Sequence, residues 1–306
     1  MSPVPAAVRA PGKALLIGEY AVLDGAPAAV AAVDRYATAM LRPAEPSSPY
    51  VRAAIEEARA ELRQLGVALP EGVPMVDTSA FLGGGHKLGI GSSAATTVAA
   101  VGALFAGAGL DPAMWREAIH RAAAAAHAAA QGERGSGADV LAATMGGIQA
   151  LHRPAPPVAL PVSVRFIATP QSASTATLLR RVREAGALAR PALQEMGSAA
   201  EEFFGAWAAQ DRQGLLRAVE RAFEAYLSLE RVVGSSLVTP AHAAIHAAAR
   251  RAGGAAKPSG AGGGDLAVVF LPNADSEEAL RVALPPMLSV LPMQVSAEGV
   301  HALWRS

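Results

Sequence analysis

The most informative feature of this sequence is a glycine- and serine-rich turn that runs directly into an alanine-rich apolar segment. Residues 87–95 read Lys-Leu-Gly-Ile-Gly-Ser-Ser-Ala-Ala. At the start of a helix, such a turn presents free backbone N–H groups, which bind anions. Gly89 and Gly91 let the backbone approach a ligand closely, and the hydroxyls of Ser92 and Ser93 can reach phosphate oxygens or a metal ion. The turn therefore predicts a phosphate site, with the lysine that opens it as a nearby cation.

The composition predicts a folded protein with a large core. The chain has 306 residues, of which 52% are hydrophobic and 17% charged, a length that suits two domains. The 26 basic and 26 acidic residues balance, which argues against nucleic acid as a partner, because that function needs a net basic face. The chain has no cysteine, so disulfides, thiolate metal sites and a cysteine nucleophile are excluded.

The sequence shows no targeting segment. Its start, MSPVPAAVRAPGKALL, lacks a basic region followed by a long apolar one. The most membrane-like stretch, residues 94–110, is made largely of Ala, Gly and Thr and is marginal in length for a membrane span. We expect this stretch to be a buried helix, and the protein to be cytoplasmic with no membrane partner.

Strand and helix patterns mix without strict βαβ alternation, which predicts an α+β fold in two lobes. A segment with four prolines, residues 152–161, suggests the boundary, giving domains 1–160 and 161–306. Apolar runs and turn residues predict strands at 14–17, 28–33, 37–41, 76–81, 148–152, 162–168, 266–271, 293–295 and 300–304. Helical spacing and caps predict helices at 50–65, 92–107, 111–130, 139–144, 177–190, 197–210, 211–233, 241–252 and 277–284.

The first glycine turn also fits a dinucleotide fingerprint formally. Gly89–Ala94 matches Gly-x-Gly-x-x-Ala, and Asp111 follows about 20 residues later. That fingerprint needs a strand immediately before it, whereas residues 83–87 are glycine-rich and polar. Asp111 precedes Pro112 and caps a helix instead. A nicotinamide-dependent oxidoreductase is therefore a weak alternative.

Two further glycine turns carry candidate functional residues. Residues 132–139 read Gly-Glu-Arg-Gly-Ser-Gly-Ala-Asp. Asp139 is equally well interpreted as a carboxylate aimed into a site or as an acidic residue in a first helical turn, where the helix dipole favours it. Residues 257–265 read Lys-Pro-Ser-Gly-Ala-Gly-Gly-Gly-Asp before an apolar strand, which indicates close backbone approach more than a flexible connector.

Single polar residues outside these glycine turns are further candidates. Lys13 follows Ala-Pro-Gly and precedes an apolar run, so its charge needs a partner; Asp139 is the natural candidate, and a solvated strand end is the alternative. His127 lies among alanines and is expected to be structural or exposed at an edge. His242 and His246 share a helix face, but the glutamate of a zinc-protease motif is missing.

Three motifs occur in one order: residues 10–22, 87–95 and 257–265. Together they resemble the GHMP kinase superfamily over most of the chain. Within it, Gly-Glu-Tyr-Ala-Val at 18–22 and the stretch 126–140 are most similar to phosphomevalonate kinases. The chain departs from that pattern in the region between Arg42 and Met75, which is short and in which the family carries substrate contacts, and Ile90 replaces the commoner Leu.

The resemblance implies a two-lobed fold, with an N-terminal ribosomal-S5-domain-2-like lobe for ATP, a C-terminal ferredoxin-like α/β lobe, and the active site in the cleft. The implied reaction transfers the γ-phosphoryl group of Mg-ATP to 5-phosphomevalonate, a phosphorylated small-molecule acceptor, in a monomer or homodimer. The implied catalytic residues are Asp139 and Lys13, and the implied ATP-binding residues are Lys87, Gly89, Ile90, Gly91, Ser92, Ser93 and Ala94, with Ser92 and Ser93 at Mg²⁺. The implied acceptor-binding residues are Tyr20, Ser136, Gly137, Lys257, Ser259, Gly260, Ala261 and Gly262.

Several alternatives stay open at this point. Mevalonate kinase or another GHMP kinase with an alcohol acceptor is the nearest, and the related diphosphomevalonate decarboxylase is less favoured. A catalytically silent ATP-binding regulator on the same fold belongs to another class; the presence of both Lys13 and Asp139 disfavours it. Arg35, Arg134 and Ser174 are candidates for the far end of the acceptor.

Overall fold

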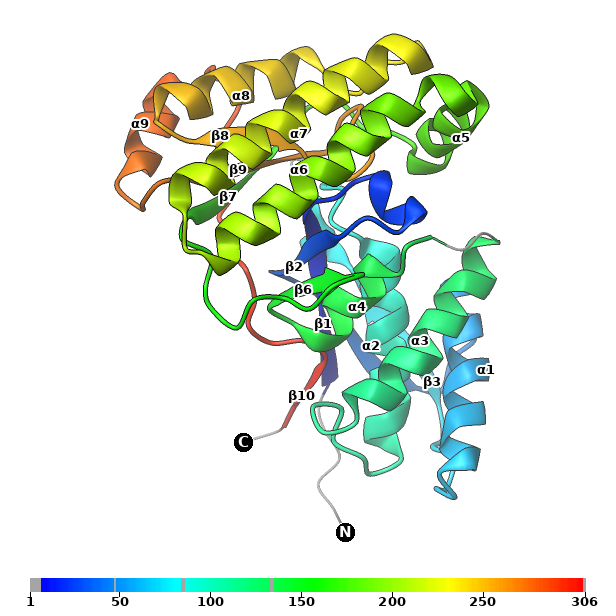
Figure 1. The fold of residues 1–306 in the computed structure, drawn as a ribbon. Coiled ribbons are helices and arrows are strands. Elements are labelled where there is room, and N and C mark those ends of the chain that lie inside the picture. Colours follow the sequence, from blue (N-terminus) through cyan, green and yellow to red (C-terminus); the bar gives the residue numbers. More distant parts are fainter. Residues whose placement is uncertain (1–6, 47, 84–85, 133–134, 305–306) are drawn as a thin grey trace. The chain divides into compact units, whose positions relative to one another are not determined.

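The computed structural model describes residues 7–46, 48–83, 86–132 and 135–304 (Figure 1). The chain forms two compact units. Unit 1 comprises Met1–Lys13, Ala31–Gln149 and Val295–Ser306, and unit 2 comprises Ala14–Val30 and Ala150–Gln294. The expected domains 1–160 and 161–306 stay a prediction, and the two units are each built from separate stretches of the chain. The C-terminal segment belongs to unit 1 because its strand pairs with the first strand of the chain.

The sheet of unit 1 has the strand order β10-β1-β2-β3, and β6 pairs with β2. Its strands are β1 (Ala7–Ile17), β2 (Ala28–Arg42), β3 (Val73–Asp77), β6 (Ile148–Leu151) and β10 (His301–Leu303). β1 pairs antiparallel with β10, and β2 pairs antiparallel with β3. The two extended segments expected at 28–33 and 37–41 form one continuous strand, β2.

A separate two-stranded hairpin precedes the first glycine turn. It consists of β4 (Leu82–Gly83) and β5 (His86–Lys87), paired antiparallel. A dinucleotide fingerprint requires a strand of a parallel sheet at this place. The expectation that no strand precedes the turn is therefore wrong, but the strands found there are short and antiparallel, so the fingerprint is still not met.

The helices of unit 1 pack around α2 (Ser92–Gly107), whose bounds match the expectation. α2 contacts α1 (Pro49–Gln64), α3 (Arg116–Gln131) and α4 (Ala138–Met145), as well as β3 and β10. Its small apolar residues are buried on all sides, as a helix inside a core requires. The helix expected from residue 111 begins only at Arg116, because the Asp111 carboxylate accepts the Ala113 N–H at 3.0 Å and closes a turn.

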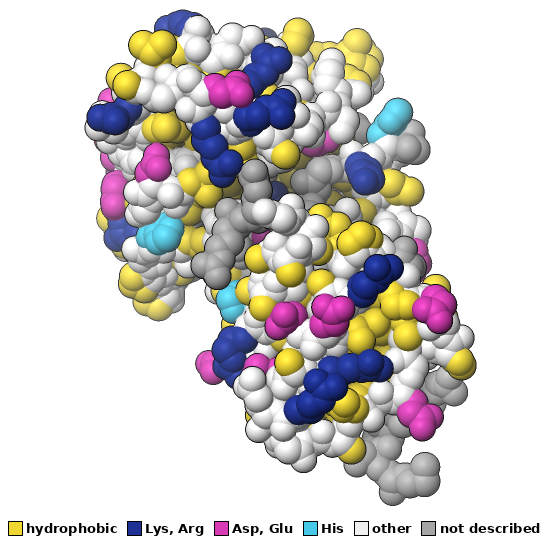
Figure 2. Space-filling view, turned by 90° about the vertical axis from the view of Figure 1, so that its right-hand side faces the viewer, with side chains coloured by type: hydrophobic (Ala, Val, Ile, Leu, Met, Phe, Trp, Pro, Cys, Tyr) yellow, Lys and Arg dark blue, Asp and Glu magenta, His cyan; other side chains and the backbone are white. Residues whose placement is uncertain are grey.

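The outer helices of unit 1 carry charges of both signs. On the face drawn in Figure 2, basic and acidic side chains lie close together over this unit. One such pair joins Arg121 of α3 to Glu61 of α1 at 2.5 Å. This agrees with the charged spacing that predicts an exposed amphipathic helix at 50–65. No helix among those described is long and apolar enough to span a bilayer.

Unit 2 contains a three-stranded antiparallel sheet of order β7-β9-β8, formed by β7 (Ser163–Ala168), β8 (Ala255–Pro258) and β9 (Leu266–Leu271). The central strand β9 is buried along its whole length. Sequence patterns did not predict β8, since its four residues directly precede the glycine turn and are too few for a periodic signal. The helices of the unit are α5 (Thr175–Ala185), α6 (Arg190–Ala208), α7 (Arg212–Val233), α8 (Pro240–Arg251) and α9 (Ser276–Ala283).

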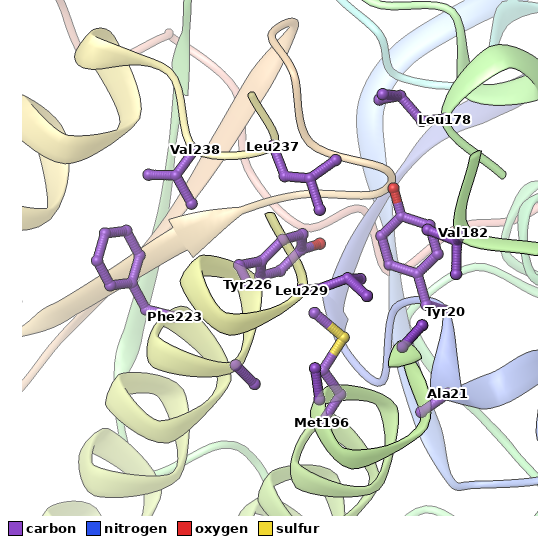
Figure 3. Close-up of a cluster of buried hydrophobic side chains, with 13 residues drawn as sticks. Tyr20, Ala21, Leu178, Val182, Met196, Phe223, Tyr226, Leu229, Leu237 and Val238 are labelled. Carbon is purple, nitrogen blue, oxygen red and sulfur yellow. The ribbon is translucent and has the colours of Figure 1, made fainter. Parts of the chain in front are cut away.

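Two hydrophobic clusters lie in the core of unit 2. One joins β9 to α8 and α9. The other lies between α5, α6 and α7 and includes two tyrosines, Tyr20 and Tyr226 (Figure 3). Tyr20 and Ala21 come from the segment 14–30 that unit 2 takes from the N-terminal part of the chain. Burial of these side chains explains why that short segment belongs to unit 2.

Candidate functional site

The first glycine turn is held against strand β1 within unit 1. Gly89 and Gly91 have φ of 69° and 76°, in the left-handed region that favours glycine. The Lys13 N–H donates to the Ile90 carbonyl at 2.8 Å. A Cβ on Gly91 would lie 2.9 Å from Cγ of Lys13, so the lysine stem packs directly on the turn. Because the Ile90 side chain is buried, only its backbone can face a ligand.

The turn ends in a helix N-terminus that no side chain caps. Gly91 is the N-cap of α2, and the first helical bond runs from the Ala95 N–H to the Gly91 carbonyl at 3.1 Å. The N–H groups of Ser92, Ser93 and Ala94 are thereby left for a ligand. Together with the helix dipole, these donors suit an anion such as phosphate.

The second glycine turn leads into α4, with Gly137 as N-cap at φ 74°. Asp139 lies in the first turn of the helix, and its carboxylate accepts the Val140 N–H at 2.9 Å. Its side chain is 25% exposed. Ser136 is exposed, and its hydroxyl accepts the Ala138 N–H at 3.4 Å. The position of Asp139 in the first helical turn agrees with the interpretation that the helix dipole favours an acidic residue there. A neighbouring residue in space supports the other interpretation, a carboxylate aimed into a functional site.

That neighbour is His127 of α3. Its Nε2 lies 3.2 Å from Oγ of Ser93 and 3.9 Å from Oδ2 of Asp139. The imidazole is buried, and its ring centroid lies 5.5 Å from that of Tyr50 on α1. Sequence analysis expects this residue to be structural or exposed at an edge, and it is buried. Its place beside Ser93 and Asp139 was not predicted, because one imidazole in a helix that is otherwise mostly alanine does not indicate where the ring lies.

The two expected cations of unit 1 occupy different environments. Lys13 is half-buried beside the turn, and Lys87 is exposed on β5. The expected ion pair between Lys13 and Asp139 is not found: in the described part of the chain, no nitrogen–oxygen contact within 4.0 Å joins them. The lysine stem packs on Gly91 instead, and the carboxylate faces His127.

The third glycine turn belongs to unit 2 and is anchored by a buried ion pair. The Lys257 ammonium donates to the Glu19 carboxylate and to the Pro258 carbonyl, the latter at 2.9 Å. The Lys257 side chain is 0% exposed and that of Glu19 is 3% exposed. The Gly260 N–H also donates to Glu19, at 3.4 Å. The ammonium expected to bind the acceptor is therefore enclosed and already paired.

Two buried tyrosines hold the same turn. The Tyr20 hydroxyl donates to the Ala261 carbonyl at 2.5 Å, and the Tyr226 hydroxyl donates to the Gly260 carbonyl. Their rings pack edge to face, with centroids 6.3 Å apart. Burial and the nearby Glu19 carboxylate raise the pKa of both tyrosines well above the usual value. Both hydroxyls consequently stay protonated and act as donors.

The backbone of this turn keeps donors available. Ser259 Oγ donates to the Leu15 carbonyl at 3.0 Å, and the Gly263 N–H donates to the Leu237 carbonyl at 2.8 Å. Between them, the N–H groups of Ala261 and Gly262 have no hydrogen-bond partner among the residues of known placement. A Cβ on Gly262 would lie 2.5 Å from the Leu237 carbonyl, so only glycine fits there. Free N–H groups in such a turn suit an anion.

The remaining candidates are distributed over the molecule. Arg35 lies on β2, Ser174 caps α5 by accepting the Thr177 N–H at 3.4 Å, and Arg134 lies outside the described residues. His242 forms a capping box with Thr239, and His246 stacks on a phenylalanine ring at 3.7 Å, so both are structural. In the described ranges, no three carboxylate or imidazole side chains converge as a protein metal cluster would.

Two sequence comparisons match this chain to known kinases. Residues 50–147 match the model of the GHMP kinases N terminal domain. A curated phosphomevalonate kinase from Streptomyces sp. (strain CL190) is 28% identical, in an alignment that covers 89% of this chain and 91% of that protein.

Solved structures with the same fold extend over nearly the whole chain. The Lin0012 protein from Listeria innocua superimposes with a TM-score of 0.83 at 22% identity, covering 96% of this chain and 98% of that one. Streptococcus pneumoniae phosphomevalonate kinase in complex with phosphomevalonate and AMPPNP gives a TM-score of 0.75 at 19% identity, covering 94% and 99%. The expected α+β GHMP kinase fold is thereby confirmed.

Proposed function

We propose that this chain is a phosphotransferase of the GHMP kinase type, which transfers the γ-phosphoryl group of ATP to 5-phosphomevalonate and gives 5-diphosphomevalonate. One observation carries the choice of acceptor: the alignment with a phosphomevalonate kinase runs over nine-tenths of both chains. In the reaction, an oxygen of the acceptor phosphate forms a bond to the γ-phosphorus, the bond from that phosphorus to the bridging oxygen breaks, and ADP leaves.

We propose that the first glycine turn binds the ATP phosphates. The uncapped N–H groups of Ser92, Ser93 and Ala94 support this, as does the left-handed backbone of Gly89 and Gly91, which lets phosphates approach. Lys13 and Lys87 add positive charge. Phosphoryl transfer is mostly positioning and charge neutralisation, so fixed donors and cations supply what it needs.

Mg²⁺ fits the donor set of this turn. Magnesium prefers oxygen ligands and is usually held by one or two carboxylates together with substrate phosphates. The hydroxyls of Ser92 and Ser93 and the carboxylate of Asp139 are such ligands, and the Ser93 hydroxyl and the carboxylate both lie near one imidazole nitrogen. When bound, the ion would neutralise charge on the phosphate oxygens.

For the acceptor, we propose the turns at 136–137 and 259–262. The free N–H groups of Ala261 and Gly262 are suited to its phosphate. Tyr20 and Lys257 contribute by holding this turn in place rather than by touching the acceptor, because the Tyr20 hydroxyl is bonded to the turn and the Lys257 ammonium is enclosed. Lys257 is accordingly assigned a positioning role.

We propose that Asp139 acts by positioning more than by removing a proton. A phosphomonoester has its second pKa near 6, so a phosphorylated acceptor is largely dianionic at pH 7 and needs little help from a base. An alcohol acceptor would need Asp139 as a base, which typically contributes 10²–10⁴-fold. With 5-phosphomevalonate, Asp139→Asn should lower kcat by less than about 10²-fold and leave the shape of the pH–kcat profile unchanged.

The decisive experiment is an ADP-release assay with Mg-ATP and a panel of acceptors: 5-phosphomevalonate, mevalonate, homoserine and galactose. Turnover confined to 5-phosphomevalonate, with diphosphorylated product identified by mass spectrometry, is expected. Preference for mevalonate would replace the proposed acceptor by an alcohol. Mg-ATP binding without turnover of any of them would favour a catalytically silent regulator, and a melting-temperature shift with NAD but not with ATP would favour an oxidoreductase.

A further inference from the structure

We propose that His127 is a positioning residue that fixes the Ser93 hydroxyl at the ATP phosphate turn. The inference rests on the proposed ATP site and assigns a role to a residue outside the three motifs. Its basis is the arrangement of three side chains from three helices: Ser93 from α2, His127 from α3 and Asp139 from α4.

The distances determine which contact is the hydrogen bond. The 3.2 Å between Nε2 of His127 and Oγ of Ser93 is a hydrogen-bond distance, whereas the 3.9 Å to Oδ2 of Asp139 is not. Nε2 of His127 is therefore hydrogen-bonded to the Ser93 hydroxyl, and the Asp139 carboxylate lies beyond hydrogen-bond distance of that nitrogen. The Asp139 carboxylate is instead bonded to the Val140 N–H at 2.9 Å.

The hydroxyl needs such a partner in order to have one orientation. A serine hydroxyl has one donor and two acceptor sites and rotates to suit its surroundings. Ser93 lies in the first turn of α2, where its hydroxyl is proposed to meet phosphate or Mg²⁺. A fixed bond to His127 leaves its remaining sites in defined directions, so the ligand does not have to order them on binding.

The ring itself is held firmly. His127 is 5% exposed, and Tyr50 packs against it with ring centroids 5.5 Å apart and planes tilted by 31°. α3 also contacts both α2 and α4, the helices that carry the other two side chains. A buried ring that contacts three helices is suited to holding the Ser93 hydroxyl in one position rather than to binding a ligand itself.

The test measures binding of Mg-AMPPNP by calorimetry, which does not involve the acceptor. His127→Gln and His127→Asn form a matched pair, because both carry an amide but only glutamine reaches as far as Nε2. We expect His127→Asn and His127→Ala to weaken binding about 2- to 10-fold, the range of one neutral hydrogen bond, and His127→Gln to restore it. His120→Ala, about 10 Å away along the same helix, is the control and should bind as the wild type does.

A double-mutant cycle with Ser93→Ala locates the effect. If His127 acts through the hydroxyl, His127→Asn should add little once Ser93→Ala is present. Full additivity, or equal binding by the glutamine and asparagine variants, would overturn the proposal even if melting temperatures shift. Wild-type binding of Mg-AMPPNP without phosphorylation of 5-phosphomevalonate would refute only the proposed acceptor, whereas no wild-type binding would refute this inference as well.

Discussion

The ammonium group of Lys257 is buried against the carboxylate of Glu19, and the two residues are 238 positions apart in the chain. The pair joins the end of β8 to the segment after β1, both within unit 2. Glu19 also accepts the Gly260 N–H, so the pair fixes the start of the third glycine turn. Burial lowers the pKa of Lys257, while the carboxylate acts against this and favours the charged form.

Breaking this pair should be costly. Lys257→Met leaves the Glu19 carboxylate buried without a cation, and we expect the free energy of unfolding to fall by about 3–5 kcal/mol. Urea unfolding followed by Trp207 fluorescence, with Trp115 and Trp304 replaced by Phe, would report on unit 2. The double variant with Glu19→Gln removes both charges and should recover most of the loss. If the double variant is as unstable as Lys257→Met alone, the loss of stability comes from lost packing and not from the unpaired charge of Glu19.

The Tyr20 hydroxyl should affect the acceptor and not ATP. Tyr20→Phe removes the bond to the Ala261 carbonyl, and we expect the KM for the acceptor to rise about 2- to 10-fold, corresponding to one hydrogen bond. Tyr226→Phe removes the equivalent bond to Gly260 and should act in the same direction. Steady-state kinetics with each substrate varied in turn would measure both. A rise in the KM for ATP alone would contradict the role assigned to this turn.

Gly91 should be irreplaceable in the ATP turn. Gly91→Ala forces a side chain into a left-handed conformation at φ 76° and within 2.9 Å of Lys13 Cγ. We expect the melting temperature to fall and Mg-AMPPNP affinity to be lost. Gly109→Ala is the matched control: it has the same backbone strain at φ 83°, of about 1–2 kcal/mol, with open space around its Cβ. Equal loss of affinity in both variants would indicate general destabilisation.

The stability of unit 2 should depend on pH through His242. Burial lowers its pKa from 6.5 to about 4. Well above pH 6.5 the imidazole is neutral in the folded and in the unfolded protein, so protonation costs no stability. Below pH 6.5 the unfolded protein takes up the proton first, and the free energy of unfolding therefore falls as the pH drops to about 4. Between pH 6.5 and 4.5 the expected loss is about 2 kcal/mol. Urea unfolding at pH 6.5 and 4.5 should show a smaller decrease for His242→Asn, and an identical decrease would exclude His242 as the cause.

Local signals predicted the elements that carry the turns. α2 has the bounds expected from its alanine-rich run after Gly91, and β9 has those expected from six apolar residues after the third turn. Glycine and proline mark such boundaries because their backbone preferences act within a few residues. The start of α3 was wrong by several residues because Asp111 formed a turn of its own.

Sequence patterns were sufficient to predict the α+β class, the three glycine turns, the helix that follows the first of them and the resemblance to GHMP kinases, since all of these depend on neighbouring residues or on short motifs. Three contacts could be found only in the folded chain: Lys257 is enclosed by Glu19, Lys13 packs on Gly91, and His127 lies beside Ser93 and Asp139. These contacts join residues far apart in the chain, and burial in a packed core, not local propensity, selects such partners.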